Sequence, residues 1–185
     1  DDTRRTATDD VRWVFLPGLG RGKGNMGIEP VTAKSRPLGD GATLEYDINF
    51  SRSGKQKLAL GILPTNDINP SRGLRIGIRV DDGEMQTIDA RQGYVDTFNE
   101  YTKENIARSK VLKPLPRPAS DIYLSGTRQH MRSEVFDNLR WLSIDLDIPT
   151  EGNHTVKVVM IDPEIVVEKL VINPDNEHPS YHGKE

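Results

Sequence analysis

Residues 22–27, GKGNMG, match G-x-G-x-x-G, the pattern of a turn that holds the pyrophosphate of a dinucleotide. In such a site the last glycine opens a helix whose N-terminal amides bind the phosphates. The residues that follow contain Pro30 and Pro37 and show no apolar recurrence at helical spacing. We therefore predict no nucleotide site and no cofactor. The glycines from Gly18 to Gly27 are instead expected to form a tight turn with positive φ angles.

The acidic residues and histidines show no catalytic or metal-binding spacing. Hydrolysis of a glycoside needs two carboxylates that face one cleft, whereas Asp145 and Asp147 alternate along a face expected to meet solvent. His178 and His182 lie four residues apart, but Pro179 between them opposes the helix that a metal-binding pair at this spacing would use. We predict neither a catalytic site nor a metal site in this chain.

The aromatic residues are more informative, because aromatic side chains can stack on sugar rings. Trp13 shares a face with Val11 and Phe15, and the alternation assigns this face to the core. Trp141 falls on the opposite face of its strand, together with Ser143. Two interpretations remain open for Trp141: it is covered by another segment, or it forms a surface that binds sugars.

A long insertion at residues 92–135 interrupts the strand pattern. Segments of this length are usually functional or disordered. A short helix around residues 96–108 would place its aromatic side chains on one side, either docked on the domain or available to a ligand. The guanidinium group of Arg128 could pair with the carboxylate of a uronic acid. The candidate carbohydrate-binding residues are Trp141, Tyr94, Tyr101, Tyr123 and Arg128.

The elements that position these residues show a period of two. Alternating apolar residues predict strands at 43–50, 57–63, 74–82, 141–149, 154–162 and 164–172, separated by Gly, Pro and Asn turns. This pattern predicts a single domain over residues 1–185, an antiparallel β-sandwich of jelly-roll type with a long, partly helical insertion.

The composition excludes several classes of function. The net charge of −3 has both signs spread along the chain, which argues against a nucleic-acid partner. No apolar run approaches the 18 residues of a membrane span, and the first residues, DDTRRTATDD, lack the apolar core of a signal peptide.

Three blocks of sequence carry a resemblance to a known family. They are W-x-x-x-x-G-L-G-R-x-x-x-x-M-x-I-x-P-V-T from Trp13 to Thr32, LEYDINF with LPTNDINPSRGLRIGIRVDD between Leu44 and Asp82, and FDNLRWLSIDL with GNHTVKVVMIDPEIVVEKLVINPDNEHPSYHG between Phe136 and Gly183. The chain resembles the C-terminal β-sandwich domain of glycoside hydrolase family 115, the bacterial xylan α-1,2-glucuronidases. It departs from the family with Asp-Pro-Glu-Ile-Val where Asp-Pro-Gly-Val-Val is usual, and it contains no catalytic α/β barrel.

The resemblance implies a non-catalytic accessory domain of a periplasmic or secreted enzyme that degrades glucuronoxylan. Such a domain would bind a polysaccharide or an oligosaccharide with uronic acid, or it would pack on the catalytic domain or in a homodimer. In the packing role, Tyr181 would be the residue that reaches another chain. The alternative is a free-standing carbohydrate-active hydrolase whose site is built from the insertion.

Overall fold

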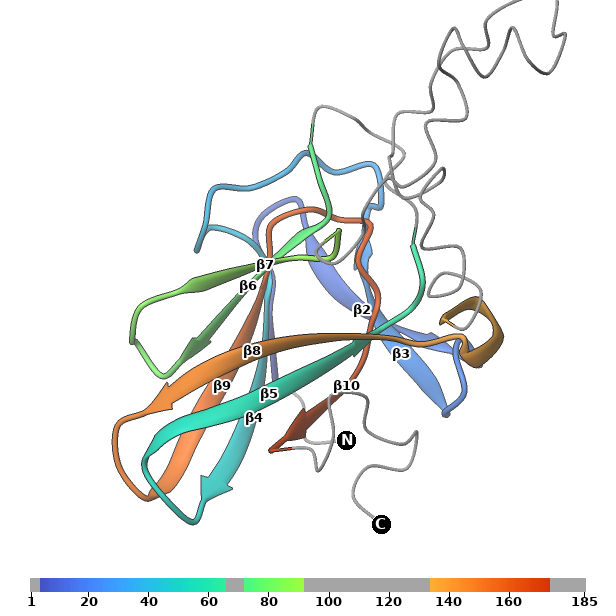
Figure 1. Cartoon of the computed structure of the whole chain (residues 1–185). Helices are drawn as coiled ribbons and strands as arrows, with labels where there is room; N and C mark the ends of the chain where they lie inside the picture. The colour runs from blue at the N-terminus through green and yellow to red at the C-terminus, as the bar shows by residue number, and fades with distance from the viewer. Residues whose placement is uncertain (1–3, 66–71, 92–133, 174–185) are drawn as a thin grey trace, which may run out of the picture.

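The computed structural model describes residues 4–65, 72–91 and 134–173, which form two antiparallel sheets of five strands each (Figure 1). One sheet has the order β1-β4-β9-β6-β7 and the other β2-β3-β10-β5-β8. The strands are β1 (Arg4–Thr6), β2 (Arg12–Pro17), β3 (Gly24–Glu29), β4 (Thr43–Phe50), β5 (Gly54–Ile62), β6 (Arg75–Val80), β7 (Gln86–Asp89), β8 (Arg140–Ile148), β9 (Gly152–Met160) and β10 (Val167–Ile172). The predicted β-sandwich is confirmed. Of the insertion expected at 92–135, only residues 134–135 are described, and they begin a single helical turn at 134–137; the helix expected around 96–108 lies outside the described residues.

The alternation read from the sequence matches the burial of the strands. In β8, Leu142 and Leu146 are buried, whereas Ser143, Asp145 and Asp147 are exposed. One apolar face per strand is buried between the sheets, because side chains point alternately to the two faces of a sheet. The strand expected at 164–172 begins only at Val167, after a turn at residues 163–164.

The core lies between the two sheets and includes one of the two tryptophans. Leu60, Ile78 and Val158 are fully buried, and burial of each such side chain contributes about 1.5–3 kcal/mol. Trp13 is 4% exposed and donates a hydrogen bond from Nε1 to the carbonyl oxygen of Ala42, 2.8 Å away. The indole therefore joins β2 to the segment before β4 without leaving a buried donor unpaired.

The glycine-rich stretch forms a hairpin turn and no helix. Gly18 and Gly20 have φ angles of 72° and 82°, and the amide of Gly18 donates to the carbonyl oxygen of Lys23 at 3.0 Å. The turn is shorter than expected, because residues from Gly24 onward pair with β2 as strand β3. A phosphate-binding helix is therefore absent from this part of the described chain.

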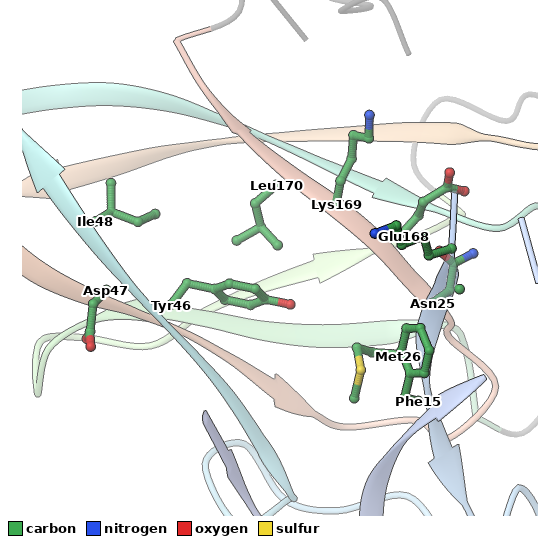
Figure 2. Close-up of a pocket in the computed structure, with 11 residues that line it drawn as sticks. Phe15, Asn25, Met26, Tyr46, Asp47, Ile48, Glu168, Lys169 and Leu170 are labelled. Atoms are coloured by element: carbon green, nitrogen blue, oxygen red, sulfur yellow. The ribbon is translucent and has the colours of Figure 1, made fainter. Parts of the chain in front are cut away.

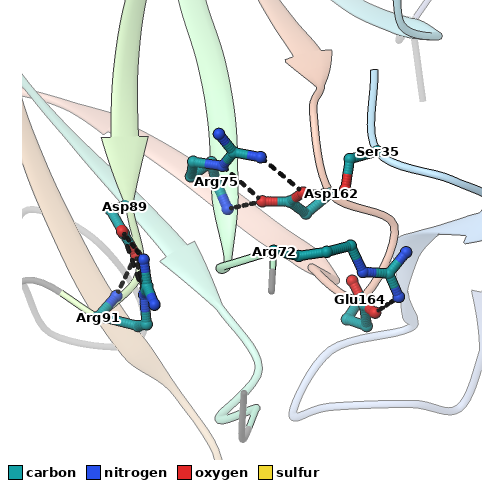
Figure 3. Close-up of polar contacts among 7 residues, drawn as sticks. All are labelled: Ser35, Arg72, Arg75, Asp89, Arg91, Asp162 and Glu164. Carbon is teal, nitrogen blue, oxygen red and sulfur yellow. Dashed lines mark hydrogen bonds and ion pairs between the residues drawn. The ribbon is translucent and has the colours of Figure 1, made fainter. Parts of the chain in front are cut away.

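A network of ion pairs closes one end of the sandwich (Figure 3). The buried carboxylate of Asp162 accepts hydrogen bonds from the Ser35 hydroxyl at 2.6 Å and from the backbone amide of Arg75 at 2.8 Å. It also accepts from Nε and Nη2 of the Arg75 guanidinium at 2.9 and 3.2 Å. Nearby, Arg72 pairs with Glu164. The Asp162 carboxylate is thus fully hydrogen-bonded and connects the segments around Ser35, Arg75 and Asp162, which are distant in sequence. This indicates a structural role.

A histidine closes the opposite end of β6. Asp81 follows β6 with a φ of 50° and accepts the backbone amide of Thr155 at 2.9 Å. The imidazole of His154 lies with Nδ1 2.6 Å from Oδ2 of Asp81 and with Nε2 2.8 Å from the carbonyl oxygen of Thr150. Because both ring nitrogens face acceptors, the hydrogen bond to Asp81 and then that to Thr150 raise the pKa of His154.

This arrangement predicts that the free energy of unfolding decreases as the pH rises above neutrality. The contribution of His154 is fully present below its unfolded pKa of about 6.5 and is lost as the pH rises through the higher folded pKa. The Asp81 carboxylate stays ionised over this range, because its pKa is lowered by the Thr155 amide and by His154. Urea denaturation at pH 6 and pH 9 should show a loss of stability in the wild type that is clearly smaller in His154→Gln. An equal loss in both proteins would contradict the assignment.

Candidate functional site

A cleft of about 550 Å³ opens between the sheets beside β3 and β10 (Figure 2). It is lined by residues of four strands and of the β2–β3 turn: Phe15, Lys23, Gly24, Asn25, Met26, Tyr46, Asp47, Ile48, Glu168, Lys169 and Leu170. Its volume lies within the range of small-ligand sites.

The cleft exists because β3 and β10 separate. The two strands pair at a single position, Val167 opposite Met26. The pairing of β10 with β5 is irregular between Val167 and Lys169, and Glu168 falls at this irregularity. Such bulges redirect side chains and end the pairing of strands. Beyond this point the sheet is open, and the interior near β4 becomes accessible.

The inner walls of the cleft are apolar and aromatic. Tyr46 and Ile48 of β4 pack against the core and are only partly buried. Figure 2 shows the Tyr46 ring extending from β4 toward the side of the cleft formed by Met26 and Phe15. The prediction that Phe15 belongs to the core is wrong, since its side chain is 41% exposed at the cleft. The core ends at Phe15 because the separation of β3 from β10 leaves the neighbouring strand uncovered.

Polar atoms of two side chains in the gap between the strands are buried without hydrogen-bond partners among the described residues. Asn25 is 2% exposed, and neither its amide nitrogen nor its amide oxygen has a hydrogen-bond partner within the described part of the chain. The same is true of both carboxylate oxygens of Glu168. A Cβ at Gly20 would collide with the Asn25 amide nitrogen and would lie 3.0 Å from Oε2 of Glu168. The two side chains therefore lie close together beside the glycine turn.

The charges around the cleft are mixed. Lys23, Lys169 and Glu168 all line the cleft. Burial lowers the pKa of the Lys169 ammonium. Asp47 accepts hydrogen bonds from Arg4 and from the Thr155 hydroxyl, each at 2.8 Å. Asp47 is thus hydrogen-bonded within the protein, whereas the Glu168 oxygens have no hydrogen-bond partner among the described residues.

Trp141 lies next to this cleft but on the outer face of the sheet. It pairs with Gly61 of β5 and does not belong to the core. The position that a Cβ on Gly61 would take is 3.1 Å from the indole Cζ3 and 3.3 Å from Cγ of Lys169. The half-buried indole therefore packs beside Lys169, which also lines the cleft.

The other residues suggested by the sequence lie outside the described residues: Tyr94, Tyr101, Tyr123, Arg128 and Tyr181. Sequence reasoning missed Asn25 and Glu168. A signal for Glu168 exists, because it is a charged residue near the middle of the apolar run IVVEKLVI. For Asn25 the sequence carries no comparable signal.

The comparison with protein families decides the relationship of the chain. A family model described as the glycosyl hydrolase family 115 C-terminal domain matches residues 2–111 and 120–185. The chain belongs to this family. The resemblance seen in the sequence blocks is therefore confirmed, although no curated protein sequence matches the chain.

The solved structures that are similar to this chain have low sequence identity to it. A family GH115 4-O-methyl-α-glucuronidase with specificity for decorated arabinogalactans matches with a TM-score of 0.54 and 12% identity, covering 94% of this chain and 18% of that one. An exo-β-1,3-galactanase from Phanerochaete chrysosporium and a family 35 carbohydrate-binding module from Clostridium thermocellum each match with a TM-score of 0.49 and 12% identity. The matches cover 92% of this chain and 27% of the galactanase, and 91% of both chains for the module. This chain spans less than a fifth of the glucuronidase.

The described cleft lining of this family 115 domain carries groups that can bind a ligand non-covalently. Among the described residues no group of three or more His, Cys, Asp or Glu side chains is placed to hold a metal ion. In the same ranges, no helix is long and apolar enough to span a membrane. The cleft offers aromatic walls, an amide and a carboxylate, which are the groups that contact sugar rings and hydroxyls.

Proposed function

We propose that this chain is a non-catalytic accessory domain of a plant-polysaccharide-degrading family 115 glycoside hydrolase, and that it binds a glycan in the cleft between β3 and β10. The observation that supports binding is the cleft itself, with the Phe15 and Tyr46 rings at its walls and unpaired polar groups at its edge. The parent protein would be an α-glucuronidase-type enzyme that is periplasmic or secreted.

The physical basis is the amphipathic surface of a pyranose ring. Its C–H face is apolar and stacks on an aromatic ring, while its hydroxyls need donors and acceptors. The cleft offers both kinds of contact within one space that is open to solvent. Trp141 is the second candidate, because its half-buried indole lies beside Lys169 on the outer face of the same sheet.

Calorimetric titration with glucuronoxylan and arabinogalactan oligosaccharides tests this proposal. We expect saturable binding that weakens about tenfold in Phe15→Ala, because one stacking contact contributes about 1.5 kcal/mol. The Phe15 ring is exposed at the cleft, so the variant should keep its fold. Trp141→Ala removes an aromatic ring from the outer face and distinguishes the two candidate positions, because a site in the cleft requires its affinity to stay unchanged.

Other results would lead elsewhere. A loss of binding in Trp141→Ala alone would move the site to the outer face of the sheet. The absence of binding across the panel would reject glycan recognition and favour packing on a catalytic domain or a homodimer partner. Release of reducing sugar during the titration would favour the hydrolase alternative.

A further inference from the structure

The unpaired polar atoms of the cleft restrict the chemistry of its ligand. Figure 2 shows Asn25 and Glu168 on the neighbouring strands β3 and β10, at the edge of the cleft. Burial of a carboxylate without a hydrogen-bond donor is unfavourable, and a ligand that supplies donors removes this cost. The ligand must therefore present hydrogen-bond donors to Glu168 and can use both the donor and the acceptor of the Asn25 amide.

A neutral sugar meets this requirement better than a uronic acid. Each hydroxyl of a neutral pyranose can donate to the Glu168 carboxylate and accept from the Asn25 amide nitrogen. The carboxylate of a uronic acid is ionised at neutral pH and only accepts hydrogen bonds. Placed beside Glu168, it would also meet a like charge whose two oxygens are shielded from solvent.

A metal ion meets the requirement less well. Of the two carboxylates in the described cleft lining, Asp47 is bonded to Arg4 and Thr155, and only Glu168 lacks a hydrogen-bond partner. A cation at Glu168 would also have to compete with its electrostatic interaction with Lys169. Hard cations such as Ca²⁺ take six to eight oxygen ligands, several of which are usually carboxylates. The cationic side chains of Lys23 and Lys169 line the same cleft and would repel such an ion.

Resting on the proposed function, we infer that the cleft takes a neutral pyranose of the polysaccharide, with Glu168 and Asn25 hydrogen-bonded to its hydroxyls, and does not take a uronic acid. The accessory domain would then hold the neutral part of the polymer and leave the charged decoration free.

The test compares neutral and acidic ligands on the same protein. Xylohexaose and β-1,3-galactohexaose are titrated in the presence and absence of glucuronate at about 50-fold excess. An excess of this order allows even a weakly bound competitor to be detected. We expect at least one neutral oligosaccharide to bind and glucuronate not to compete. Glu168→Gln should weaken this binding about tenfold or more, because hydrogen bonds to charged groups are the stronger ones.

Glu29→Gln is the matched control, since it makes the same change at a paired carboxylate of β3 that does not line the cleft. We expect it to leave the affinity unchanged. Glu168→Gln breaks no hydrogen bond within the described residues, so its unfolding midpoint in urea should not fall.

Three results would overturn the inference. Competition by glucuronate together with stronger binding in Glu168→Gln would show that the lysines select the acid, while glycan binding itself would stand. Saturable Ca²⁺ binding that disappears in Glu168→Gln would make the pair a cation site. The absence of binding by every neutral and acidic glycan would reject the proposed function together with this inference.

Discussion

Replacement of Trp13 by alanine is expected to lower the free energy of unfolding by about 3–5 kcal/mol, the cost usually seen for a buried aromatic side chain. The indole is 4% exposed and packs in the core with Met26 and Ile28. Its removal leaves a large cavity and also deprives the carbonyl oxygen of Ala42 of its donor at 2.8 Å. Urea denaturation followed by circular dichroism measures the change.

Trp141→Ala is the matched control, because it removes the other tryptophan of the chain. This indole lies outside the core and packs over Gly61, so we expect a loss of about 1 kcal/mol, typical of partly exposed positions. An equal loss of unfolding free energy in the two variants would contradict the placement of Trp13 in the core and of Trp141 on the outer face.

The second large effect is expected at the ionic end of the sandwich. Asp162→Ala should lower the free energy of unfolding by about 3 kcal/mol or more, because it removes a buried carboxylate that accepts several hydrogen bonds and leaves a backbone donor without its acceptor. The Asp162 carboxylate is 1% exposed and accepts from Ser35 and from both the backbone and the guanidinium of Arg75. After its removal the Arg75 guanidinium can turn to solvent, whereas the backbone amide cannot, and this amide carries much of the cost.

Glu29→Ala gives the comparison for an exposed pair. Glu29 bonds Arg12 at 2.6 Å, and both side chains are more than half exposed. Surface pairs of this kind contribute about 0–1 kcal/mol. Thermal denaturation should therefore show a clearly lower melting temperature for Asp162→Ala than for Glu29→Ala. A loss for Asp162→Ala no larger than that for Glu29→Ala would reject the structural role of the network.

The strands were predictable because period-two alternation is a local property. β4 and β8 were found with bounds close to those observed, since each has one apolar face that only the interior of a sandwich can bury. The orientation of Trp141 away from the core followed from the same pattern. The family relationship was also visible, because its blocks span most of the chain and depend on residue identity.

The sequence led to errors where pairing between distant strands decided the result. The sequence predicts one turn for the glycine-rich stretch, yet the residues from Gly24 onward form strand β3. They are extended because their backbone pairs with β2, although glycine by itself has little preference for a strand. Phe15 was assigned to the core from its alternation with Trp13. Its exposure results from the separation of β3 and β10, and no local pattern encodes that separation.

The order of residue types along the chain is enough to predict the β-class of this protein, the orientation of its tryptophans and its membership of the family 115 C-terminal domains. The place where a ligand could enter depends on contacts between strands that are distant in sequence. Asn25 and Glu168 are 143 residues apart and meet because β3 and β10 become neighbours in one sheet. Local periodicity reports the environment of each residue along its own strand, whereas a cleft depends on which strands are adjacent and where their pairing ends.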